Sequence, residues 1–384
     1  MNRRNWLKNT ALLTGGITML PPAISRLQAA AKPVLSSNTV SDMTFAAGMP
    51  PDLKARLFAN ENPFGPSAKA KQAMTDSMGT SYQYQLTQVK ELEEKICAFE
   101  GLDPKMIMTG SGSSPLLLGA ALALLSKGGN VVTADPTYDD LPTRCEHINA
   151  TWIKVPLTAE YKHDLDAMEK AINADTKLVY ICNPNNPTGT IVDAEKLKSF
   201  CERVSKKVTV FVDEAYIDYL PDPQSTTLIG NAKKGQNIIV ARTFSKLYGL
   251  AGMRVGYVIA QPEMISLLGN YAATGLFSLS APAIAAALAS YQDKTYMQDA
   301  LQKMVKSKQY LYDVLKAEGY SYIPSNTNFV MFPLKMDGVR FTDEMMKRGV
   351  GLRHWKLNNA EWCRISIGRM DEMEAFAAAF KELS

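Results

Sequence analysis

Short apolar runs alternate with helix-like segments through the central part of the chain. Nearly every residue is apolar in four of these runs, so they are predicted as strands: 130–134, 178–181, 208–212 and 238–240. Strands of this kind are buried on both faces, whereas strands with one solvated face alternate between apolar and polar residues. The pattern therefore predicts an α/β fold in which a mostly parallel sheet is sandwiched by helices.

The two ends of the chain have a different pattern. A helix is predicted from about Ser67, a suitable N-cap, and residues 88–99 place their apolar side chains on one helical face. Beyond about residue 290, a long helix (296–318) precedes short strands at 328–332 and 363–367 and a final helix. This arrangement predicts a second, smaller α+β domain.

Polar residues that are unusual for a core follow the predicted strands. Tyr138, Asn186 and Asp213 come at or just after the ends of three strands, and Lys246 follows a fourth. Parallel strands end at one edge of a sheet, and open α/β sheets bind their ligands at that edge. We therefore expect these four side chains to belong to one site.

Lys246 lies in a stretch, residues 242–257, that suits neither a core nor an ordinary solvated face. Hydroxyl groups and glycines surround it, and Arg242 and Arg254 flank it. A lysine near an anion-binding loop can form a Schiff base with a carbonyl cofactor, while hydroxyls and arginines hold the phosphate of that cofactor. The segment alone is equally compatible with a surface lysine in a glycine-rich turn.

A second candidate phosphate site is the loop Gly110-Ser-Gly-Ser-Ser-Pro115, which lies between a short predicted strand (106–109) and a predicted helix. Backbone amides at a helix N-terminus bind anions. Pro115 replaces the third glycine of the dinucleotide-binding pattern, and the loop also lacks the lysine of a P-loop. The loop is therefore either a phosphate cradle of another type or a plain turn.

The other strand-end residues also allow two interpretations each. Asp213 ends an apolar strand, where a carboxylate needs a cationic partner, either a side chain or a protonated ligand nitrogen. Tyr138 either stacks on a flat ring or packs in the core. Asn186, in a turn, either caps that turn or donates to a ligand.

The composition is that of a globular enzyme, with 46% hydrophobic and 21% charged residues, and 384 residues allow one or two domains. The formal net charge of +4 comes from residues 1–31, which contain four basic residues and no acid. A chain that is near neutral beyond this segment is not expected to bind nucleic acid or an anionic membrane as its main partner.

Residues 1–31 are predicted to be a targeting segment. Arg3, Arg4 and Lys8 precede a short apolar run, and Ala29-Ala-Ala31 has the small residues of a cleavage site. The run is too short to span a membrane. The paired arginines resemble a twin-arginine signal, which exports folded proteins, so we expect a periplasmic or otherwise exported protein. The alternative is an amphipathic N-terminal arm.

Cysteine and histidine do not form a recognisable metal or disulfide pattern. The five cysteines are scattered without a C-x-x-C pair, and their odd number argues against a complete disulfide framework. None of the three histidines has metal-ligand spacing with another. We expect no metal, and we expect the cysteines to be small buried residues.

Together, these parts match the needs of pyridoxal 5′-phosphate. That cofactor requires a lysine for its aldehyde, an acid at its ring nitrogen and a phosphate site. An aromatic residue for the ring face and polar groups for the ring oxygen complete the set. The combination, in this chain order, is more specific than any single residue.

The chain resembles the fold-type I, class I and II aminotransferases, and most closely their histidinol-phosphate aminotransferase branch. Eight motifs, spread over nearly everything after residue 31, carry the resemblance: Ala59-Asn-Glu-Asn-Pro-Phe-Gly-Pro66, Gly112-Ser-Ser114, Pro136-Thr-Tyr138, Asn183-Pro-Asn-Asn-Pro-Thr-Gly189, Val212-Asp-Glu-Ala-Tyr216, Arg242 to Arg254, Ser325-Asn-Thr-Asn-Phe329 and Arg364-Ile-Ser-Ile-Gly368.

The resemblance implies a role for each matching residue. Lys246 would be the Schiff-base lysine and proton shuttle, Asp213 the partner of the pyridine nitrogen, and Tyr138 the stacking residue. Asn186 and Tyr216 would bond the phenolic oxygen of the ring. The residues implied for the cofactor phosphate are Gly112, Ser113, Ser114, Thr243, Ser245 and Arg254, with Tyr84 from a neighbouring subunit. Those implied for the substrate are Arg364 and Arg353 for its anion and Asn62 near the entrance.

The resemblance also implies a large cofactor-binding domain (76–290) and a small domain built from an N-terminal segment (32–75) and a C-terminal segment (291–384). The chain departs from the family pattern at two places. Ser114-Pro115 replaces the usual acidic residue after the loop, and Gln-Leu follows Tyr84 in place of Pro-Asp.

The expected activity is ping-pong transamination between an amino acid, or an amino-alcohol phosphate, and a 2-oxo acid. The expected partners are these small molecules and a second copy of the chain, with the membrane involved only during export. A decarboxylase, racemase or lyase on the same fold is the nearest alternative, because the sequence does not determine which bond at Cα is broken. A non-catalytic binding module is a second alternative, which the joint presence of Lys246 and Asp213 disfavours.

Overall fold

The computed structural model describes residues 53–272 and 274–383, which lie within a compact unit spanning residues 48–384. The predicted targeting segment (1–31) and the residues up to 52 lie outside the described part of the chain, as do Arg3 and Arg4.

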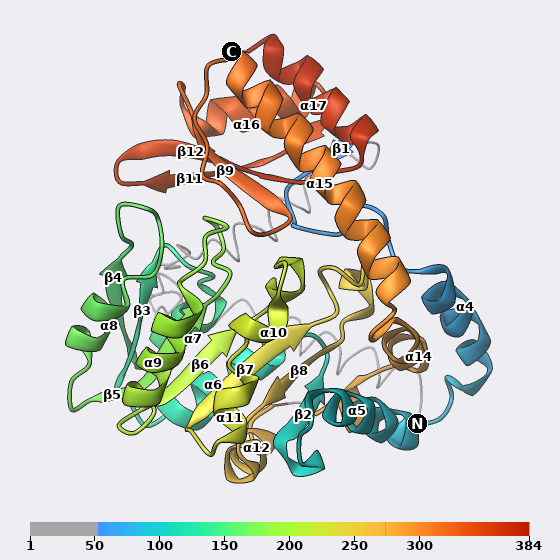
Figure 1. Ribbon diagram of the computed structural model, residues 1–384, viewed down its shortest axis with the longest axis vertical. Helices are drawn as coiled ribbons and strands as arrows, with labels where there is room; N and C mark the ends of the chain where they lie inside the picture. Colours follow the sequence, from blue (N-terminus) through green and yellow to red (C-terminus); the bar gives the residue numbers. More distant parts are fainter. Residues whose placement is uncertain (1–52, 273, 384) are drawn as a thin grey trace, which may run out of the picture. The chain divides into compact units, whose positions relative to one another are not determined.

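A seven-stranded sheet forms the larger layer of this unit, in the strand order β2-β8-β7-β6-β5-β3-β4 (Figure 1). The strand bounds are β2 Ile107–Gly110, β3 Asn130–Asp135, β4 Thr151–Pro156, β5 Thr176–Cys182, β6 Thr209–Asp213, β7 Ile238–Thr243 and β8 Gly256–Ile259. Strands β4, β3, β5, β6 and β7 pair in parallel, whereas β8 is antiparallel to both β7 and β2. The predicted α/β class with a mostly parallel sheet is confirmed.

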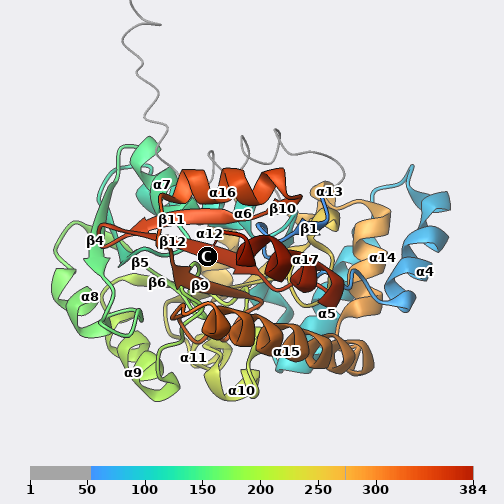
Figure 2. The same cartoon turned by 90° about the horizontal axis from the view of Figure 1, so that it is seen from above.

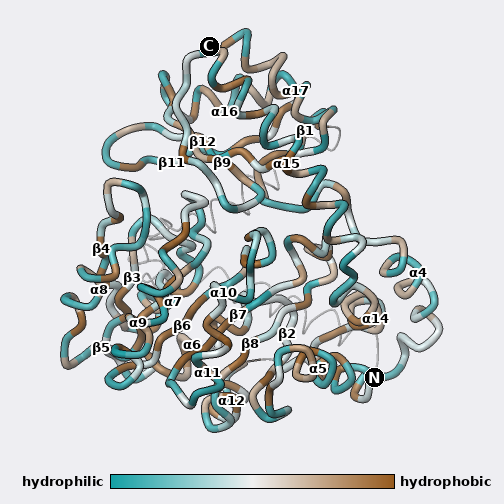
Figure 3. Tube along the Cα trace, viewed as in Figure 1, coloured by the Kyte–Doolittle hydropathy of each residue, from teal (hydrophilic) through white to brown (hydrophobic). Residues whose placement is uncertain are grey.

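Both faces of this sheet are apolar because alternate residues of each strand point to opposite sides. In β5, Val179 and Ile181 join one hydrophobic cluster, while Leu178 and Tyr180 join the other. The first cluster includes side chains from α5, α8, α9 and α14, and the second from α6, α7 and α12. Figure 3 shows the resulting hydrophobic colour along strands of the large sheet.

The helices of this layer are α4 Ala68–Ser77, α5 Leu86–Glu100, α6 Ser114–Leu125, α7 Asp140–His147, α8 Leu165–Ala171, α9 Ala194–Val204, α10 Pro223–Thr226, α11 Ile229–Lys233, α12 Pro262–Gly269, α13 Gly275–Ser278 and α14 Ala281–Ser290. The predicted N-cap Ser67 accepts a hydrogen bond from the Ala70 amide at 3.1 Å. None of the helices in the described residues is long and apolar enough to cross a membrane.

Two strands of the large sheet were not predicted. Strand β4 is the edge strand, and most of its side chains are exposed or half-buried, so it lacks the apolar run of the inner strands. Strand β8 is short and follows a glycine-rich stretch. Sequence pattern detects burial on two faces, and edge or very short strands give little of that signal.

Two smaller sheets join the ends of the chain. Strand β1 (Ala55–Arg56) pairs in parallel with β10 (Val350–Gly351), and β11 (Arg353–Leu357), β12 (Ala360–Ser366) and β9 (Phe329–Pro333) form an antiparallel sheet. Helices α15 (Lys294–Ala317), α16 (Gly338–Lys347) and α17 (Met370–Lys381) lie close to these strands in the view of Figure 2. The α+β character predicted for this part is observed.

The antiparallel sheet has two chemically different faces. Val330, Phe332, Cys363 and Ile365 belong to a hydrophobic cluster that also contains side chains of α15, α16 and α17. The alternate residues of β9, β11 and β12, among them Met331, Trp355 and Trp362, form a separate cluster with Tyr161 of the larger layer. The second face also carries Arg353 and Arg364, because residues two apart on a strand share a face.

Candidate active site

The carboxyl ends of the parallel strands meet at one edge of the large sheet, as the sequence predicted. Asp213 ends β6, Lys246 follows β7, Asn186 follows β5, and Tyr138 follows β3. Strand β2 runs parallel to β7 because β8 is antiparallel to both. The Gly/Ser loop after β2 therefore opens at the same edge.

Lys246 is partly buried, and its Nζ donates a hydrogen bond to the backbone oxygen of Asn60 at 3.3 Å. The same nitrogen lies 5.3 Å from the ring centroid of Tyr216. Burial, followed by repulsion from Arg364, lowers the pKa of Lys246 to about 8. A larger fraction of this amine than of an ordinary lysine is thus uncharged and nucleophilic near neutral pH.

Asp213 is almost fully buried. Its Oδ1 accepts from the Ala215 amide at 3.0 Å, and its Oδ2 accepts from the Tyr180 hydroxyl at 3.2 Å. Burial raises the pKa of Asp213 to about 6. Within the described residues it makes no ion pair, so this costly carboxyl group is available for a cationic ligand atom.

Tyr216 lies beneath the N-terminal segment of the small layer. The Asn60 side-chain amide donates to the Tyr216 hydroxyl at 3.1 Å, and the Ser366 hydroxyl donates to Asn60 Oδ1 at 3.0 Å. Burial raises the pKa of the Tyr216 phenol above its usual range. The phenol therefore stays protonated and can donate to a ligand oxygen.

Arg364 connects the small layer to the cofactor-side residues. Its Nη1 donates to Asn186 Oδ1 at 2.7 Å, and its Nη2 donates to the Phe58 backbone oxygen at 2.7 Å. Its Nε has no hydrogen-bond acceptor among the described residues although the residue is 3% exposed. A buried guanidinium with one unmet donor is suited to an incoming anion.

The Gly/Ser loop makes a close backbone cradle. Gly112 has φ +84°, and a Cβ there would lie 2.3 Å from Nη2 of Arg254. A Cβ at Gly256, the first residue of β8, would lie 2.7 Å from the Ser113 amide nitrogen. Both positions need glycine because the loop, the start of β8 and the Arg254 side chain converge there.

Hydroxyl groups extend this cradle from β7. The Thr243 hydroxyl donates to Ser245 Oγ at 2.9 Å, and Arg254 Nη1 donates to the same oxygen at 3.3 Å. Ser113 immediately precedes helix α6, and Ser114 is its first residue, so free amides of that helix start face the loop. The predicted phosphate ligands from the two segments are thus brought together.

Tyr138 and Ser114 have a third, unpredicted neighbour, Asp140. This residue is 3% exposed, and its Oδ1 accepts from Arg144 Nε at 2.9 Å. Its Oδ2 has no hydrogen-bond partner among the described residues. Burial raises the pKa of Asp140, and Arg144 and a hydrogen bond with Ser114 oppose that rise. Asp140 therefore places a carboxyl group beside the Gly/Ser loop, in which Ser114-Pro115 replaces the acidic residue of the family pattern.

Arg353 lies directly opposite Arg364 in the β11–β12 pair. Its guanidinium carbon is 4.3 Å from the ring centroid of Trp355, and that of Arg364 is 4.5 Å from the same centroid. Burial, followed by repulsion from Arg364, lowers the pKa of Arg353. The two predicted anion-binding residues are therefore neighbours.

Two predicted residues have other surroundings. Asn62 donates from its side chain to the Leu247 backbone oxygen at 2.6 Å and to the Tyr296 hydroxyl at 2.9 Å, so it supports the segment that follows Lys246. Tyr84 is 74% exposed, and its ring contacts Phe277 edge-on at 5.6 Å. Its implied role for a neighbouring subunit stays a prediction.

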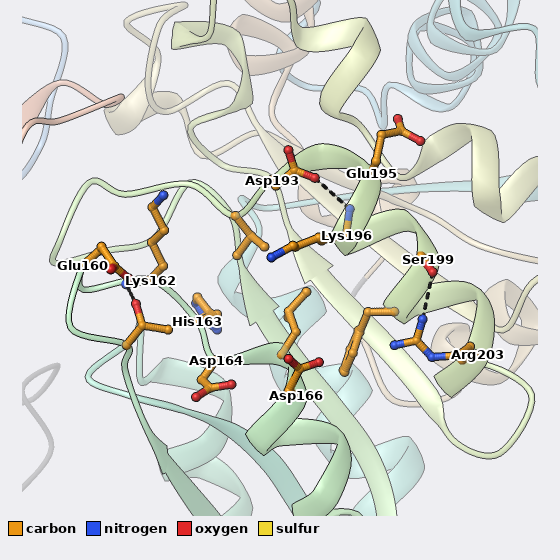
Figure 4. Close-up of a pocket in the computed structure, with 14 residues that line it drawn as sticks. Glu160, Lys162, His163, Asp164, Asp166, Asp193, Glu195, Lys196, Ser199 and Arg203 are labelled. Carbon is orange, nitrogen blue, oxygen red and sulfur yellow. Dashed lines mark hydrogen bonds between the residues drawn. The ribbon is translucent and has the colours of Figure 1, made fainter.

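A separate cavity of about 610 Å³ lies at α8 and α9 (Figure 4) and contains none of the predicted site residues. Its charged side chains have mixed signs, and several are already bonded. Asp193 accepts from the Lys196 amide at 2.9 Å, and Arg203 Nη1 donates to Ser199 Oγ at 2.8 Å. This cavity lacks the lysine–carboxylate pair of the strand-end site.

The sequence pattern missed four residues of the strand-end site. Asn60 has φ 54°, and its place in a turn-rich stretch is only a general sign of such a conformation. Tyr180 lies within an apolar strand, where the pattern does not distinguish its hydroxyl-bearing ring from the other core side chains. Asp140 and Trp355 belong to no motif, and only the packing of distant elements gives them partners.

The site fits pyridoxal 5′-phosphate. Asp213 offers a buried carboxyl for the ring nitrogen, the cradle around Gly112 offers phosphate donors, and Lys246 offers an amine of lowered pKa. All three parts lie at the same edge of the large sheet, so one bound cofactor can contact them together.

Comparison with known proteins agrees with this geometry. The model of the family "Aminotransferase class I and II" matches residues 52–380.

The chain belongs to this family.

Among its aminotransferase relatives, the histidinol-phosphate aminotransferase of Moorella thermoacetica is 32% identical over 92% of this chain and 90% of its own length. The histidinol-phosphate aminotransferase of Brevibacillus brevis is 35% identical over 85% of this chain and 90% of its own length. The crystal structure of the Sinorhizobium meliloti histidinol-phosphate aminotransferase in complex with pyridoxal 5′-phosphate matches with a TM-score of 0.80 and 27% identity, covering 87% of this chain and 92% of that one.

Proposed function

We propose that this aminotransferase uses pyridoxal 5′-phosphate to move an amino group from an anionic amine, either an amino acid or an amino-alcohol phosphate, to a 2-oxo acid. One observation carries the proposal. Lys246 and Asp213 lie at the same sheet edge with pKa values of about 8 and about 6, displaced in opposite directions by burial. A nucleophilic amine and a carboxyl that needs a cation are the two groups this cofactor requires.

The residues that would hold the cofactor come from the ends of five strands and from the segment that precedes β8. Gly112, Ser113, Ser114, Thr243, Ser245 and Arg254 would hold its phosphate. Asp213 would hold its ring nitrogen, supported by Tyr180. Asn186 and Tyr216 would hold its phenolic oxygen, and Tyr138 would cover a face of its ring.

When bound, the cofactor supplies an aldehyde for the amine and a ring that withdraws electrons from the bonds at Cα. Lys246 performs the proton work. Its Nζ, once free and uncharged, would take the proton from Cα of the substrate and pass it to the C4′ carbon of the cofactor. The lowered pKa of Lys246 suits it to both directions of that transfer.

The substrate class follows from the two arginines on the small sheet. Arg364 has an unmet Nε donor, and Arg353 lies opposite it across the strand pair. A carboxylate or a phosphate matches two guanidinium groups, which favour planar or multiply charged anions. The relatives from Moorella and Brevibacillus are histidinol-phosphate aminotransferases, so histidinol phosphate is a reasoned first donor to test.

The test uses purified holoenzyme and follows its visible absorbance after mixing with single amino donors, histidinol phosphate among them, without an acceptor. Loss of the absorbance, and its return on adding a 2-oxo acid, are expected for amino transfer. The Lys246→Ala variant should lack both changes. Release of CO₂ or ammonia in place of a transferable amino group would show a decarboxylase or lyase instead. Unchanged turnover in Lys246→Ala would contradict the role of that lysine.

We also propose that the protein is exported by residues 1–31 and works as a homodimer in which Tyr84 reaches the neighbouring phosphate site. The paired Arg3 and Arg4 support the export proposal, and the exposed Tyr84 and Phe277 rings support the dimer. Fusing residues 1–31 to a folded reporter should carry it to the periplasm, and replacing both arginines by lysine should retain it in the cytoplasm. Equal export of both fusions would contradict a twin-arginine signal.

A further inference from the structure

Trp355 has an unusual position on the site-facing side of the small sheet. The guanidinium carbons of Arg353 and Arg364 lie 4.3 Å and 4.5 Å from the centroid of its ring. One arginine is two residues away on β11, and the other is on the neighbouring strand β12, directly opposite the first. One indole therefore contacts both cationic groups of the predicted anion site.

This contact offsets an electrostatic cost. Like charges that lie directly opposite each other in an antiparallel pair destabilise a sheet. The face of an indole ring is the strongest aromatic partner for a guanidinium group. Trp355 thus gives a favourable cation–π contact to each of two arginines that occupy directly opposite positions in the strand pair.

The hydrogen bonds of Arg364 leave one of its donors available for an anionic ligand. Its Nη1 and Nη2 are bonded to Asn186 Oδ1 and to the Phe58 backbone oxygen, which fixes the plane of the guanidinium. Its Nε lacks an acceptor among the described residues. Arg353, whose guanidinium contacts the same indole ring, is the second cation on this face of the sheet.

We propose that Trp355 is a specificity-determining residue, which positions Arg353 and Arg364 so that both contact one anionic group of the substrate. This inference rests on the proposed function, because it names the residue that gives that site its preference for anionic amines. Trp355 acts through the two arginines, so it is a positioning residue and not a catalytic one. Its loss should raise the KM for anionic substrates while kcat changes little.

Trp362 provides a matched control. It lies directly opposite Trp355 on β12 and has the same exposed fraction, 8%. Its ring contacts Tyr161 edge-on at 5.4 Å rather than an arginine. Truncating either tryptophan removes a similar packed volume, but only Trp355 supports the arginine pair.

The experiment compares Trp355→Leu, Trp355→Phe and Trp362→Leu with the wild-type holoenzyme. Steady-state kinetics use L-glutamate, histidinol phosphate and the uncharged-tail analogue histidinol as donors. Calorimetry measures the binding of inorganic phosphate to each holoenzyme, and thermal unfolding checks that each variant is folded. We expect Trp355→Leu to raise the KM for histidinol phosphate and the dissociation constant for phosphate about tenfold, equivalent to about 1.4 kcal/mol.

Trp355→Phe keeps an aromatic face and should recover most of the affinity, and the KM for histidinol should change little in every variant. A rise for L-glutamate as well as histidinol phosphate would show that carboxylates use the same pair; a rise for histidinol phosphate alone would assign the pair to phosphate. Either result supports the proposal.

Equal weakening in Trp362→Leu, or unchanged phosphate binding in Trp355→Leu, would overturn it. Failure of the proposed function would give a different result. A wild type that binds phosphate in a Trp355-dependent way but aminates no 2-oxo acid would contradict aminotransfer and still support the anion site.

Discussion

Lys246 and Asp213 show how burial prepares single residues for chemistry. The amine loses part of its affinity for protons, and the carboxyl gains affinity, because each charged form is poorly solvated at the sheet edge. Repulsion from Arg364 adds to the effect on the lysine, whereas hydrogen bonds from the Ala215 amide and the Tyr180 hydroxyl oppose the effect on the aspartate.

The first prediction concerns the uptake of cofactor by Lys246. Only the uncharged amine attacks an aldehyde, so the attachment rate should rise with pH and level off above a pH of about 8, the pKa of Lys246. The measurement mixes cofactor-free protein with pyridoxal 5′-phosphate between pH 6 and 10 and records the appearance of visible absorbance. A rate that continues to rise to pH 10, as expected for an exposed lysine, would contradict the lowered pKa.

The second prediction concerns the stability of the cofactor-free protein. The pKa of Asp213 rises from 3.8 to about 6 on folding, so between these values the folded state holds a proton that the unfolded state has lost. The free energy of unfolding should therefore fall as pH rises through this window, by about 3 kcal/mol from this group alone.

Asp213→Asn removes the titrating group and isolates its effect. The difference in unfolding free energy between the wild type and this variant, measured in urea at pH 4 and pH 7, should change by about 2 kcal/mol in favour of the variant, because the unfolded state is already partly deprotonated at pH 4. A difference that is the same at both pH values would show that burial does not raise the pKa of Asp213. Turnover should fall by more than about 100-fold in the same variant, since the ring nitrogen loses its anionic partner.

At the scale of elements, the phosphate cradle depends on three adjacent strands. Gly110, Gly256 and Thr243 are register partners across β2, β8 and β7, so the loop after β2 and the segments around β8 meet at one point. The antiparallel β8 is essential for this arrangement, because it brings Arg254 to the edge where the parallel strands end.

Gly112→Ala should weaken cofactor binding by at least about tenfold, because its Cβ would displace the Arg254 side chain that bonds Ser245. Gly235→Ala is the matched control. Its φ of +83° gives the same backbone strain as the +84° of Gly112, but its Cβ would meet nothing within 4 Å. Fluorescence titration of both cofactor-free variants measures the affinity, and equal loss in the two would show that strain alone is responsible.

A buried ion network fixes the ends of β6 and β7 against α5. Arg242 Nε and Nη1 donate to Glu214 at 3.0 Å and Glu100 at 2.9 Å, and all three side chains are at most 8% exposed. Glu214 and Arg242 directly adjoin Asp213 and Thr243 in the chain. The network therefore holds two functional strand ends in place.

Arg242→Met should lower the free energy of unfolding by about 3–5 kcal/mol, because it leaves two buried carboxylates without their cation. Arg203→Met breaks the exposed pair with Glu169, so it should cost less than about 1 kcal/mol. Urea unfolding of both variants at pH 7 measures the contrast. A small loss in Arg242→Met would mean that the carboxyl groups take up protons instead.

At the scale of the whole molecule, the dimer proposal has a direct genetic test. Lys246→Ala and Tyr84→Ala should each be nearly inactive alone. If Tyr84 serves the neighbouring site, a mixed dimer contains one intact site, so co-expression should recover about a quarter of the wild-type activity. Activity no higher than that of the separate variants would show that Tyr84 serves its own subunit or none.

The pattern of apolar and polar residues was sufficient to predict the central strands and the polar residues that follow them. It failed for β4 and β11, whose mixed polar positions resemble loops, and for the short β8. It also placed Lys246, Asp213, Asn186 and Tyr138 at one edge, because parallel strands must end together. It did not reveal Asn60, Asp140, Tyr180 or Trp355, since each acquires its partners from an element that is distant in the chain.

The sequence by itself determined which residues are available for chemistry, because strand periodicity and the succession of elements are local properties of the chain. Only the tertiary structure decided how they are tuned. Burial depth sets the pKa values of Lys246 and Asp213, and the packing of the small sheet brings Arg364 to Asn186 and Trp355 to both arginines. These are contacts between segments far apart in the chain, and no local pattern encodes them.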